Sequence, residues 1–465
     1  MAATLGVVGT LLLAGTTVVA DVSVGFGKTD ITPDLSKHTA WLAGYGNNRK
    51  ATGVHDPLWS RAVVLRDGDR KVALVSVDLV GLQRPTVMAI RDKLPGYAHV
   101  LVSSTHNHEA PDVIGLWGPS PRESGVDPSY LAFVVDRVVA SVKEAEGGAA
   151  PAKATYGTAE DGDLLKDARM PIVKDPVLRV VRFEKSDGGQ PIGLLVQWNC
   201  HPESLGSRNT LVTADFPYAT VRALEAKHKV PVAYFTGAVG GLMTNPGEHR
   251  KADGTVVKDS TFEFADAFGE AVAHLTDKAL EKTEAVGLAP FVVSTAPVLI
   301  PLANPGYRQG RAIGVLPRQA FLWKRDGAGP PEPAGPTQVD GDIALQTEVS
   351  YLRLGDLHIA AIPGELYPEL VYGHYQEPVD PNVDFPDAPL EPPVMTSLPG
   401  KAKLLFGLAS DEVGYIIPKR QWDDKAPFAY GRKEKQYGEV NSVGPEVAPL
   451  LMKALQERVR EAGGR

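Results

Sequence analysis

The sequence predicts an α/β (α+β) fold in which mixed sheets are flanked by helices. Short runs rich in β-branched residues alternate with amphipathic stretches, and the strand-like runs concentrate in the first half of the chain. At 465 residues the chain exceeds the about 250–300 residues that one core usually reaches. This length predicts either two domains or one large domain with insertions.

The first strand-like runs lead into one well-marked helix. The runs span residues 22–33, 61–82 and 99–108. In the helix, Asp127 is the expected N-cap and Pro128 the first helical residue. Apolar side chains then recur at helical spacing from Leu131 to Val142, so this helix is expected to cover the sheet with one face.

Three further helices and one hairpin are predicted after residue 200. The helices are expected around residues 215–229, 262–282 and 445–462. In the hairpin, Gly355 and Asp356 form a tight-turn signal between two strands. Glu365 follows the second of these strands, directly after Pro363 and Gly364.

Two proline-rich segments, residues 324–342 and 377–400, predict long surface loops. Proline has no N–H group to donate to a β-ladder, so neither segment is expected to be a core strand. Loops of this length often form lids or binding rims, and they are at least as often variable insertions.

The composition narrows the classes of function. Hydrophobic residues make up 43% of the chain and charged residues 22%, and the net charge is -8. This balance is typical of a globular protein and offers no basic field for a phosphate backbone, so nucleic acid is not an expected partner. The single cysteine, Cys200, excludes an internal disulfide and any zinc site with several cysteines. At the end of an apolar run, Cys200 is expected to be a buried small residue and not a nucleophile.

The N-terminal segment predicts export. Residues 5–20 form an apolar run of signal-peptide length that ends in small residues before Asp21. The segment lacks a basic start, and a buried first strand or a short membrane anchor are the alternative interpretations. We therefore expect residues 1–20 to be a signal peptide and the protein to be periplasmic or extracellular.

Two histidines, His106 and His108, follow an apolar run within the stretch SSTHNHEAPD. Alternate side chains of a strand point to one side, so both imidazoles are expected to face one cavity while Asn107 points away. His201 also follows an apolar run, so a second strand end could bring a third imidazole. Paired histidines suit a metal such as zinc, although two histidines on one strand are often only hydrogen-bonded.

Two other classes of metallohydrolase fit the spacing poorly. A metallo-β-lactamase-like site needs the pattern H-x-H-x-D-H, whereas Glu109, Ala110, Pro111 and Asp112 follow His108 here. An amidohydrolase barrel places its H-x-H near the first strand, but two or more strands precede His106 and no eightfold βα rhythm is present.

Six motifs occur in the order and setting of the neutral/alkaline (non-lysosomal) ceramidase family. They are VSVGFGKTDITP, GVHDPLWSRAVVL, SSTHNHEAPD, NCHPESLGSRNTLVTADFPYA, AIPGELYPEL and ASDEVGY. The sequence resembles the catalytic N-terminal domain of this family from about Val22 to the mid-400s. The resemblance implies one zinc ion per chain and hydrolysis of the amide bond of N-acyl sphingosine by a zinc-activated water.

The resemblance also implies roles for single residues. The metal ligands matched to the family's motifs are His106, His201, Glu365 and Tyr415. His108 matches the histidine near the attacking water, and Arg169 resembles an arginine that lines the substrate site. Tyr430 resembles a second active-site tyrosine of the family. Asp56, Asp78 and Asp215 are candidates to support the site or to hold a second, structural cation.

Three departures from the family pattern concern the substrate. Glu109, Asp112 and Trp117 replace a glycine-rich turn, which predicts a bulkier and more acidic rim. The turn AVGGLMTNP lacks the aspartate that the family tends to have there, and it has no G-K-[ST] that would make it a phosphate loop. The sequence contains no counterpart of the family's C-terminal immunoglobulin-like domain, so residues 21–465 are expected to be a single catalytic domain.

The leading hypothesis is therefore an exported zinc-dependent amidohydrolase of the ceramidase type, acting on linear amides in sphingolipid metabolism. Its partner would be an N-acyl lipid or another small N-acyl compound, with transient contact to a membrane surface. The alternatives are a metal-dependent esterase or phosphoester hydrolase and a non-catalytic exported binding protein. The sequence specifies neither the acyl length nor an oligomeric state.

Overall fold

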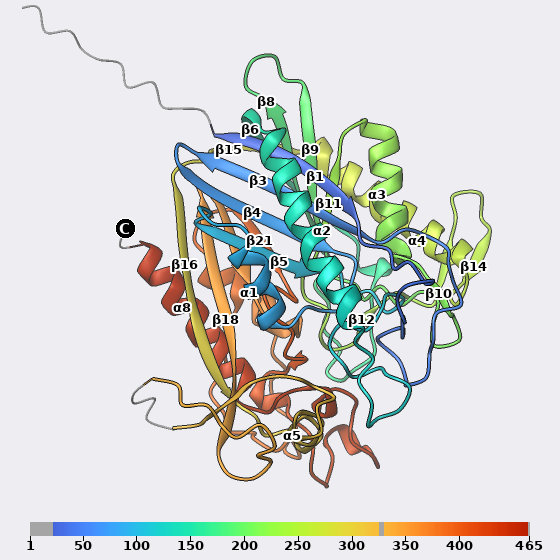
Figure 1. Ribbon diagram of the computed structural model, residues 1–465, viewed down its shortest axis with the longest axis vertical. Helices are drawn as coiled ribbons and strands as arrows, with labels where there is room; N and C mark the ends of the chain where they lie inside the picture. The colour runs from blue at the N-terminus through green and yellow to red at the C-terminus, as the bar shows by residue number, and fades with distance from the viewer. Residues whose placement is uncertain (1–21, 325–329, 464–465) are drawn as a thin grey trace, which may run out of the picture.

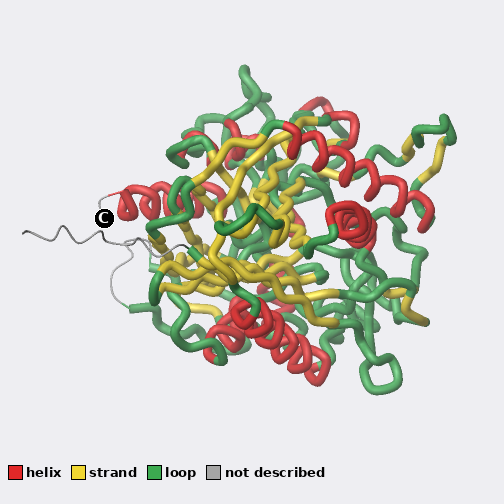
Figure 2. Tube along the Cα trace, turned by 90° about the horizontal axis from the view of Figure 1, so that it is seen from above, coloured by secondary structure: helices red, strands yellow, loops and turns green. Residues whose placement is uncertain are grey.

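Two apolar sheet faces packed against each other form the central core of the protein. The computed structural model describes residues 22–324 and 330–463. The predicted signal peptide at residues 1–20 lies outside these residues. Figures 1 and 2 show the strands in the middle of the molecule and helices on the outer sides. The predicted fold class, mixed sheets flanked by helices, is confirmed.

The larger sheet is mixed. Its strands run in the order β11 (Val232–Thr236), β9 (Pro191–Trp198), β8 (Val177–Lys185), β6 (Ala150–Glu160), β1 (Ser23–Asp30), β3 (Trp59–Asp67), β4 (Arg70–Val77) and β5 (His99–Ser104), and β15 (Thr283–Val286) also pairs with β6. The pairs β4–β5 and β9–β11 are parallel, and the pairs between β9 and β4 along this order are antiparallel. The predicted strand runs before residue 108 correspond to β1, β3, β4 and β5.

The smaller sheet faces the first. It contains β16 (Phe291–Pro301), β18 (Ile343–Leu354), β19 (Leu357–Ala361) and β21 (Ala402–Phe406) in this order, and β17 (Ala320–Leu322) pairs with β18. The predicted hairpin is confirmed, because β18 and β19 pair antiparallel around Gly355, which has a φ of 62°. Phe235 of the larger sheet and Phe406 of the smaller one stack with ring centroids 4.3 Å apart. Burying such faces is the main favourable contribution to folding.

Helices cover the outer face of each sheet. The helices are α1 (Arg84–Asp92), α2 (Pro128–Gly147), α3 (Asp215–His228), α4 (Phe262–Glu281), α5 (Pro305–Ala312), α6 (Glu369–Tyr372), α7 (Val394–Ser397) and α8 (Val447–Gly463). The structure confirms the predicted start of α2, where Asp127 accepts hydrogen bonds from the backbone N–H groups of Ser129 and Tyr130. The helices α2, α3 and α4 lie on the larger sheet, while α8 packs on β16 and β18 (Figure 1).

Short elements complete the described chain. The two-stranded ladders are β2 (Gly53–Val54) with β10 (Leu211–Val212), β7 (Lys166–Asp167) with β12 (Met243–Thr244), β13 (Glu248–Arg250) with β14 (Val256–Lys258), and β20 (Glu365–Leu366) with β22 (Tyr415–Ile416). Single 3-10 turns cover Gly162–Leu164, Lys419–Gln421, Ala429–Gly431 and Glu439–Asn441. The segment 377–400 contains no strand, as predicted, and α7 is its only helix.

Hydrogen bonds draw both edges of the larger sheet toward the end of β21. Thr236, the last residue of β11, donates its hydroxyl to the carbonyl of Thr105, just after β5, at 2.8 Å. Ser103 Oγ donates to the Gly407 carbonyl at 2.8 Å, and the Gly407 N–H donates to the Thr236 carbonyl at 2.9 Å. The strand ends of both sheets therefore meet at one place.

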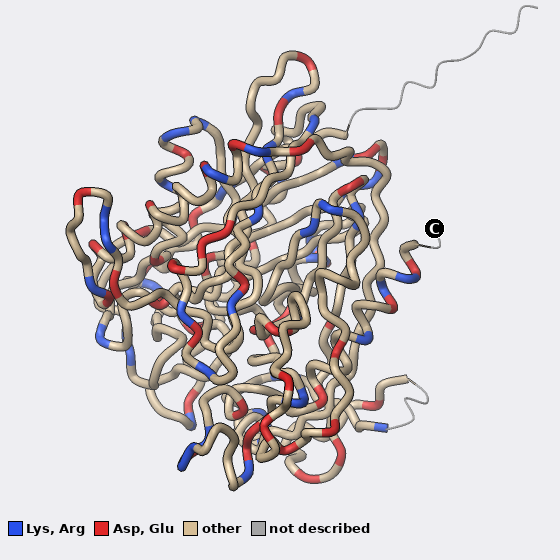
Figure 3. The backbone as a smooth tube through the Cα atoms, turned by 180° about the vertical axis from the view of Figure 1, so that it is seen from behind, with Lys and Arg blue, Asp and Glu red and all other residues tan. Residues whose placement is uncertain are grey.

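The surface carries both signs of charge. Lys and Arg residues lie among Asp and Glu residues over the rear view in Figure 3, without a broad basic face. Of the helices in the described ranges, not one combines the length and the apolar character needed to cross a membrane.

Candidate metal centre and active site

The four predicted metal ligands lie where four strands end. His106 follows β5 and His201 follows β9, both in the larger sheet. Glu365 begins β20 shortly after β19, and Tyr415 begins β22 shortly after β21. Because these strand ends meet, residues far apart in the sequence come together in one buried site.

His106 lies past the end of its strand, in a left-handed backbone conformation. The strand β5 ends at Ser104, and His106 has a φ of 68°, which is rare for a residue with a side chain. Its Nδ1 donates a hydrogen bond to the carbonyl of Val80 at 2.7 Å. Residues 106–108 therefore do not continue the strand as predicted, but both imidazoles line one pocket as expected, with ring centroids 4.9 Å apart.

His201 is fixed in the same way from the other side. Its Nδ1 donates to the carbonyl of Met243 at 2.9 Å, so its Nε2 is directed into the site. The Nε2 atoms of His201 and His106 lie 3.0 Å and 3.3 Å from Glu365 Oε2. A backbone carbonyl that holds the far nitrogen of a histidine is the usual arrangement around a protein-bound metal.

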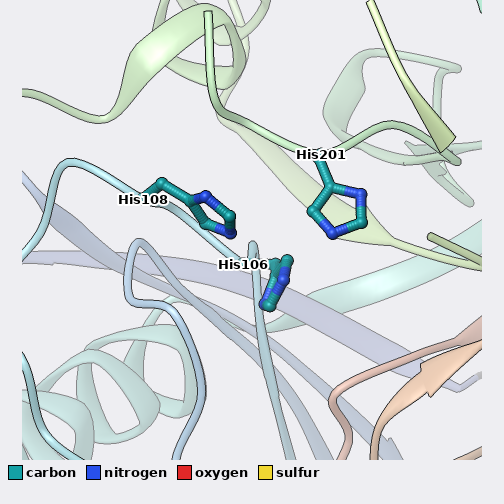
Figure 4. Close-up of side chains that lie close together, drawn as sticks. All are labelled: His106, His108 and His201. Carbon is teal, nitrogen blue, oxygen red and sulfur yellow. The ribbon is translucent and has the colours of Figure 1, made fainter. Parts of the chain in front are cut away.

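The donor set fits a metal ion. When Nδ1 of each histidine carries the proton, the lone pairs of the two Nε2 atoms and a carboxylate oxygen point at one another. These three electron-pair donors repel each other, and a cation bound between them would remove the repulsion. Two imidazoles and one carboxylate form a ligand set known from catalytic zinc sites. The ligand atoms of His106, His108 and His201 also lie within 4.8 Å of one another, and Figure 4 shows the three rings around a common space.

Burial and charge shape the titration of this cluster. Burial alone would raise the pKa of Glu365, but the charge and hydrogen bonds of His106 and His201 hold it well below its ordinary value. Burial likewise opposes protonation of His201, yet its hydrogen bond to Glu365 raises its pKa above the usual range. The site therefore favours a negative carboxylate and a bound positive charge.

His108 differs from the other two histidines. Its Nδ1 is buried without a hydrogen-bond partner among the described residues, and Glu203 Oε2 lies 3.6 Å away. Burial, followed by the charges of His106 and His201, lowers the pKa of His108 well below its ordinary value. A Cβ atom at Gly44 would come within 2.2 Å of the His108 ring, so only glycine fits beside it. His108 is thus a neutral imidazole packed close to the cluster.

Tyr415 lies beside Glu365. The two residues are partners in the parallel ladder of β20 and β22. Burial, and then the Glu365 carboxylate, raise the pKa of Tyr415 well above its ordinary value. Its role as a metal ligand stays a prediction.

A pocket opens onto this cluster. It is narrow, with a cavity volume of about 80 Å³. His106, His108, Glu365 and Tyr415 contribute to its wall. Apolar side chains make up much of the rest, namely Val80, Ile114, Leu116, Trp117, Leu302, Leu316, Leu345, Val413 and Val443. The pocket therefore suits a ligand with a hydrocarbon part beside the metal-binding cluster.

Arg169 and Tyr430 do not line this pocket. Arg169 is 2% exposed and pairs with Glu439 at 2.7 Å, and it also donates to the backbone carbonyls of Gln421 and Tyr437. Tyr430 is anchored elsewhere, through its N–H to Asp380 at 2.8 Å. The catalytic roles predicted for Arg169 and Tyr430 stay predictions.

The prediction that Glu109 and Asp112 make the rim of the pocket acidic is wrong. Glu109 is fully buried and pairs with Arg49 at 2.7 Å, while Asp112 accepts the N–H groups of Ile114, Gly115 and Trp117 at 2.8 Å each. Both carboxylates bind groups inside the protein and stabilise the loop that follows His108, and neither lines the pocket. Trp117 does line the pocket, as expected of a bulkier rim.

The candidate supporting aspartates hold loops around the cluster. Asp78 pairs with Arg61 at 2.8 Å, and its carbonyl accepts from Asn107, which points away from the cavity as expected. Asp215 accepts the N–H of Ser204 at 2.8 Å. Asp56 accepts the Thr213 hydroxyl at 2.7 Å. These contacts fit a supporting role.

The pocket wall also contains residues that were not predicted from the sequence, including Tyr307, Glu412 and Tyr437. Tyr437 is 48% exposed, and its ring lies 5.9 Å from that of Tyr415, so it stands near the mouth of the pocket. Burial, and then Glu365, raise the pKa of Glu412 well above its ordinary value. Only the position of Glu412 inside the motif ASDEVGY, three residues before Tyr415, could have drawn attention to it.

Comparison with known proteins confirms the resemblance read from the motifs. Residues 22–247 match the family described as neutral/alkaline non-lysosomal ceramidase, N-terminal. A neutral ceramidase of Mycobacterium tuberculosis is 29% identical over 221 residues, covering 42% of this chain and 34% of that protein. One from Pseudomonas aeruginosa is 24% identical over 214 residues, covering 41% and 32%. The chain thus spans about a third of the length of these relatives.

Solved structures share the fold over almost the whole chain. The crystal structure of neutral ceramidase from Pseudomonas aeruginosa aligns with a TM-score of 0.69 at 15% identity, covering 95% of this chain and 74% of that one. A ceramidase complexed with C2 aligns with the same TM-score at 16% identity, covering 95% and 76%. At these identities the likeness is one of fold.

Proposed function

Because residues 22–247 belong to the neutral/alkaline, non-lysosomal ceramidase family, we propose that this protein is a zinc-dependent hydrolase that cleaves the amide bond of an N-acyl lipid. One observation carries the proposal. The Nε2 atoms of His106 and His201 converge on Glu365 Oε2 at 3.3 Å and 3.0 Å, at the head of a largely apolar pocket.

The proposed ligands are His106, His201, Glu365 and Tyr415, and each would act from a fixed position. The carbonyls of Val80 and Met243 keep both histidines turned with Nε2 inward. Zinc held there would supply Lewis-acid polarisation of an acyl carbonyl and a water that ionises near neutral pH.

His108 is the proposed proton carrier. Its pKa is lowered by burial and then by the neighbouring histidines, so the ring is neutral at pH 7 and can accept a proton from water. The same ring would then deliver the proton to the departing amine nitrogen. The phenol of Tyr437 lines the pocket and would donate a hydrogen bond to the oxygen on which negative charge develops.

A lipid substrate is supported by the apolar wall and by the relatives. A solved ceramidase structure of the same fold is complexed with C2, and two curated relatives are neutral ceramidases. The acyl chain would lie along the apolar side chains of the pocket wall, which include Ile114 and Leu345. With such a substrate we propose transient contact with a membrane surface and export of the protein, in line with the apolar segment at residues 5–20.

The test measures metal content and hydrolysis with the full chain. The wild type should bind about one zinc per chain and hydrolyse N-acyl sphingosine, and His106→Ala should lose both properties. His274→Ala, at an exposed histidine, is the matched control and should keep both. A panel of fluorogenic amides, esters and phosphoesters separates the alternatives. A metal-free wild type, or a clear preference for phosphoesters, would refute the proposal.

A further inference from the structure

Glu412 places a carboxyl group in the wall of the pocket. It shares this wall with His106, Glu365 and Tyr415, and the wall also contains the apolar residues Val413 and Val443. The carboxylates that the sequence suggested for this purpose, Glu109 and Asp112, are turned away into the loop. Among the described residues that line the pocket, Glu365 and Glu412 are the only acidic ones, and Glu365 belongs to the metal cluster.

The position of Glu412 is fixed relative to the metal cluster. Its Oε1 accepts the N–H of Gly414, next to Tyr415, at 2.6 Å. On its other side it packs on Gly81, where an added Cβ would lie only 2.8 Å from Glu412 Cγ. The preceding residue, Val80, holds His106 through its carbonyl. Glu412 is therefore clamped between two segments that also position residues of the cluster.

The second carboxyl oxygen of Glu412, Oε2, is buried and makes no hydrogen bond to the described residues. The cationic neighbour Arg318 is already engaged by the Asp411 carboxylate and donates to the backbone carbonyls of Gln346 and Glu412 at 3.1 Å each. An unpaired buried polar atom destabilises the empty pocket, and a hydrogen-bonding group that enters the pocket would remove this cost.

Building on the proposed function, we infer that Glu412 recognises a hydrogen-bond donor, an ammonium or a hydroxyl, on the amine half of the N-acyl substrate. The acyl half of a simple fatty amide is hydrocarbon and suits the apolar wall, whereas the amine half can carry a hydroxyl or an ammonium group. A site that hydrogen-bonds a substrate group also discriminates against analogues that lack this group, because its own polar atom is then left unpaired. Glu412 thus acts as a specificity residue.

Three matched amides test this assignment. They are the dodecanoyl amides of ethanolamine, ethylenediamine and ethylamine, which carry a hydroxyl, an ammonium and no donor at the same place. For the wild-type protein, kcat/KM should be about tenfold or more higher for the two donor amides than for the ethylamide. Glu412→Leu should abolish this preference, so that its kcat/KM values for the three amides become similar. Glu412→Gln should retain the preference for the hydroxyl and lose that for the ammonium.

Glu391→Leu is the matched control. Glu391 likewise accepts a backbone N–H, from Lys419, with Oε1, and has a buried Oε2 without a partner, but it lies outside the pocket wall. This variant should keep the wild-type preference. A wild type that does not distinguish the three amides, or a Glu412→Leu variant that slows all three equally, would overturn the assignment.

Calorimetric binding of the same amides separates this assignment from the proposed function. Preferential binding of the donor amides without any turnover refutes the hydrolase and supports the role of Glu412. Turnover of all three amides with equal binding supports the hydrolase and refutes that role.

Discussion

Glu365 and Tyr415 are partners in the two-residue parallel ladder of β20 and β22. This pairing places a carboxylate that contacts two histidines beside a phenol whose pKa is raised well above its ordinary value by burial and then by Glu365. The ladder therefore links the ends of β19 and β21 in one site, and each side chain can be tested separately.

Tyr415→Phe tests whether the phenol binds the metal. As a ligand, Tyr415 should contribute to affinity, so the variant should bind zinc about 10–100-fold more weakly in competition with a chelator. Tyr367→Phe is the matched control, because the Tyr367 ring lies 6.1 Å from that of Tyr415 and its buried hydroxyl lacks a partner among the described residues. Unchanged zinc affinity with a reduced kcat would assign the Tyr415 hydroxyl to the reacting carbonyl instead.

His108→Ala separates proton transfer from metal binding. The three-histidine cluster allows His108 to be a ligand, whereas the contacts of Glu365 involve only His106 and His201. If His108 carries the proton, kcat should fall by about 10²–10⁴-fold while the zinc content stays near that of the wild type. Loss of zinc to the same extent as in His106→Ala would show that His108 is a ligand.

Arg169 and Glu439 form a buried pair whose removal should destabilise the protein. Both side chains are 1% exposed, so either single change leaves one charge buried without its partner. Arg169→Met and Glu439→Gln should each lower the free energy of unfolding by about 3–5 kcal/mol. Urea unfolding of the two single variants and the double variant measures their coupling, and the double variant should lose much less than the sum. Additive losses would contradict the pairing.

Much of the fold and of the metal cluster was predictable from local sequence. The helices near residues 128, 215, 262 and 447 follow from their sequence patterns, with the Asp127 cap marking the first, and the hairpin of β18 and β19 follows from Gly355. His106 and His201 are conspicuous because each follows a buried strand. Glu365 and Tyr415 stood out only because their motifs resemble those of a known family.

The direction of loop side chains was not predictable. Whether Glu109 faces the pocket depends on Arg49, which lies 60 residues earlier in the sequence, and on the left-handed backbone at His106. Tyr437 and Tyr430 lie seven residues apart in an irregular segment, yet only Tyr437 lines the pocket. Such orientations are set by tertiary hydrogen bonds, which local spacing does not encode.

His99 should make stability depend on pH. Burial, followed by the charge of Arg91, lowers the pKa of His99 to about 4 from 6.5. Between pH 6.5 and 4 the unfolded chain therefore takes up a proton that the folded protein does not, so the free energy of unfolding falls as the pH falls.

The test compares the wild type with His99→Leu by urea unfolding from pH 7 to pH 4. The stability difference in favour of the wild type should shrink by up to about 3 kcal/mol over this range, because only the wild type carries the titrating group. His274→Leu, at an exposed position, should follow the wild type within about 0.5 kcal/mol at every pH. A constant difference between wild type and His99→Leu would show that His99 titrates alike in both states, and that burial beside Arg91 does not disfavour its charged form.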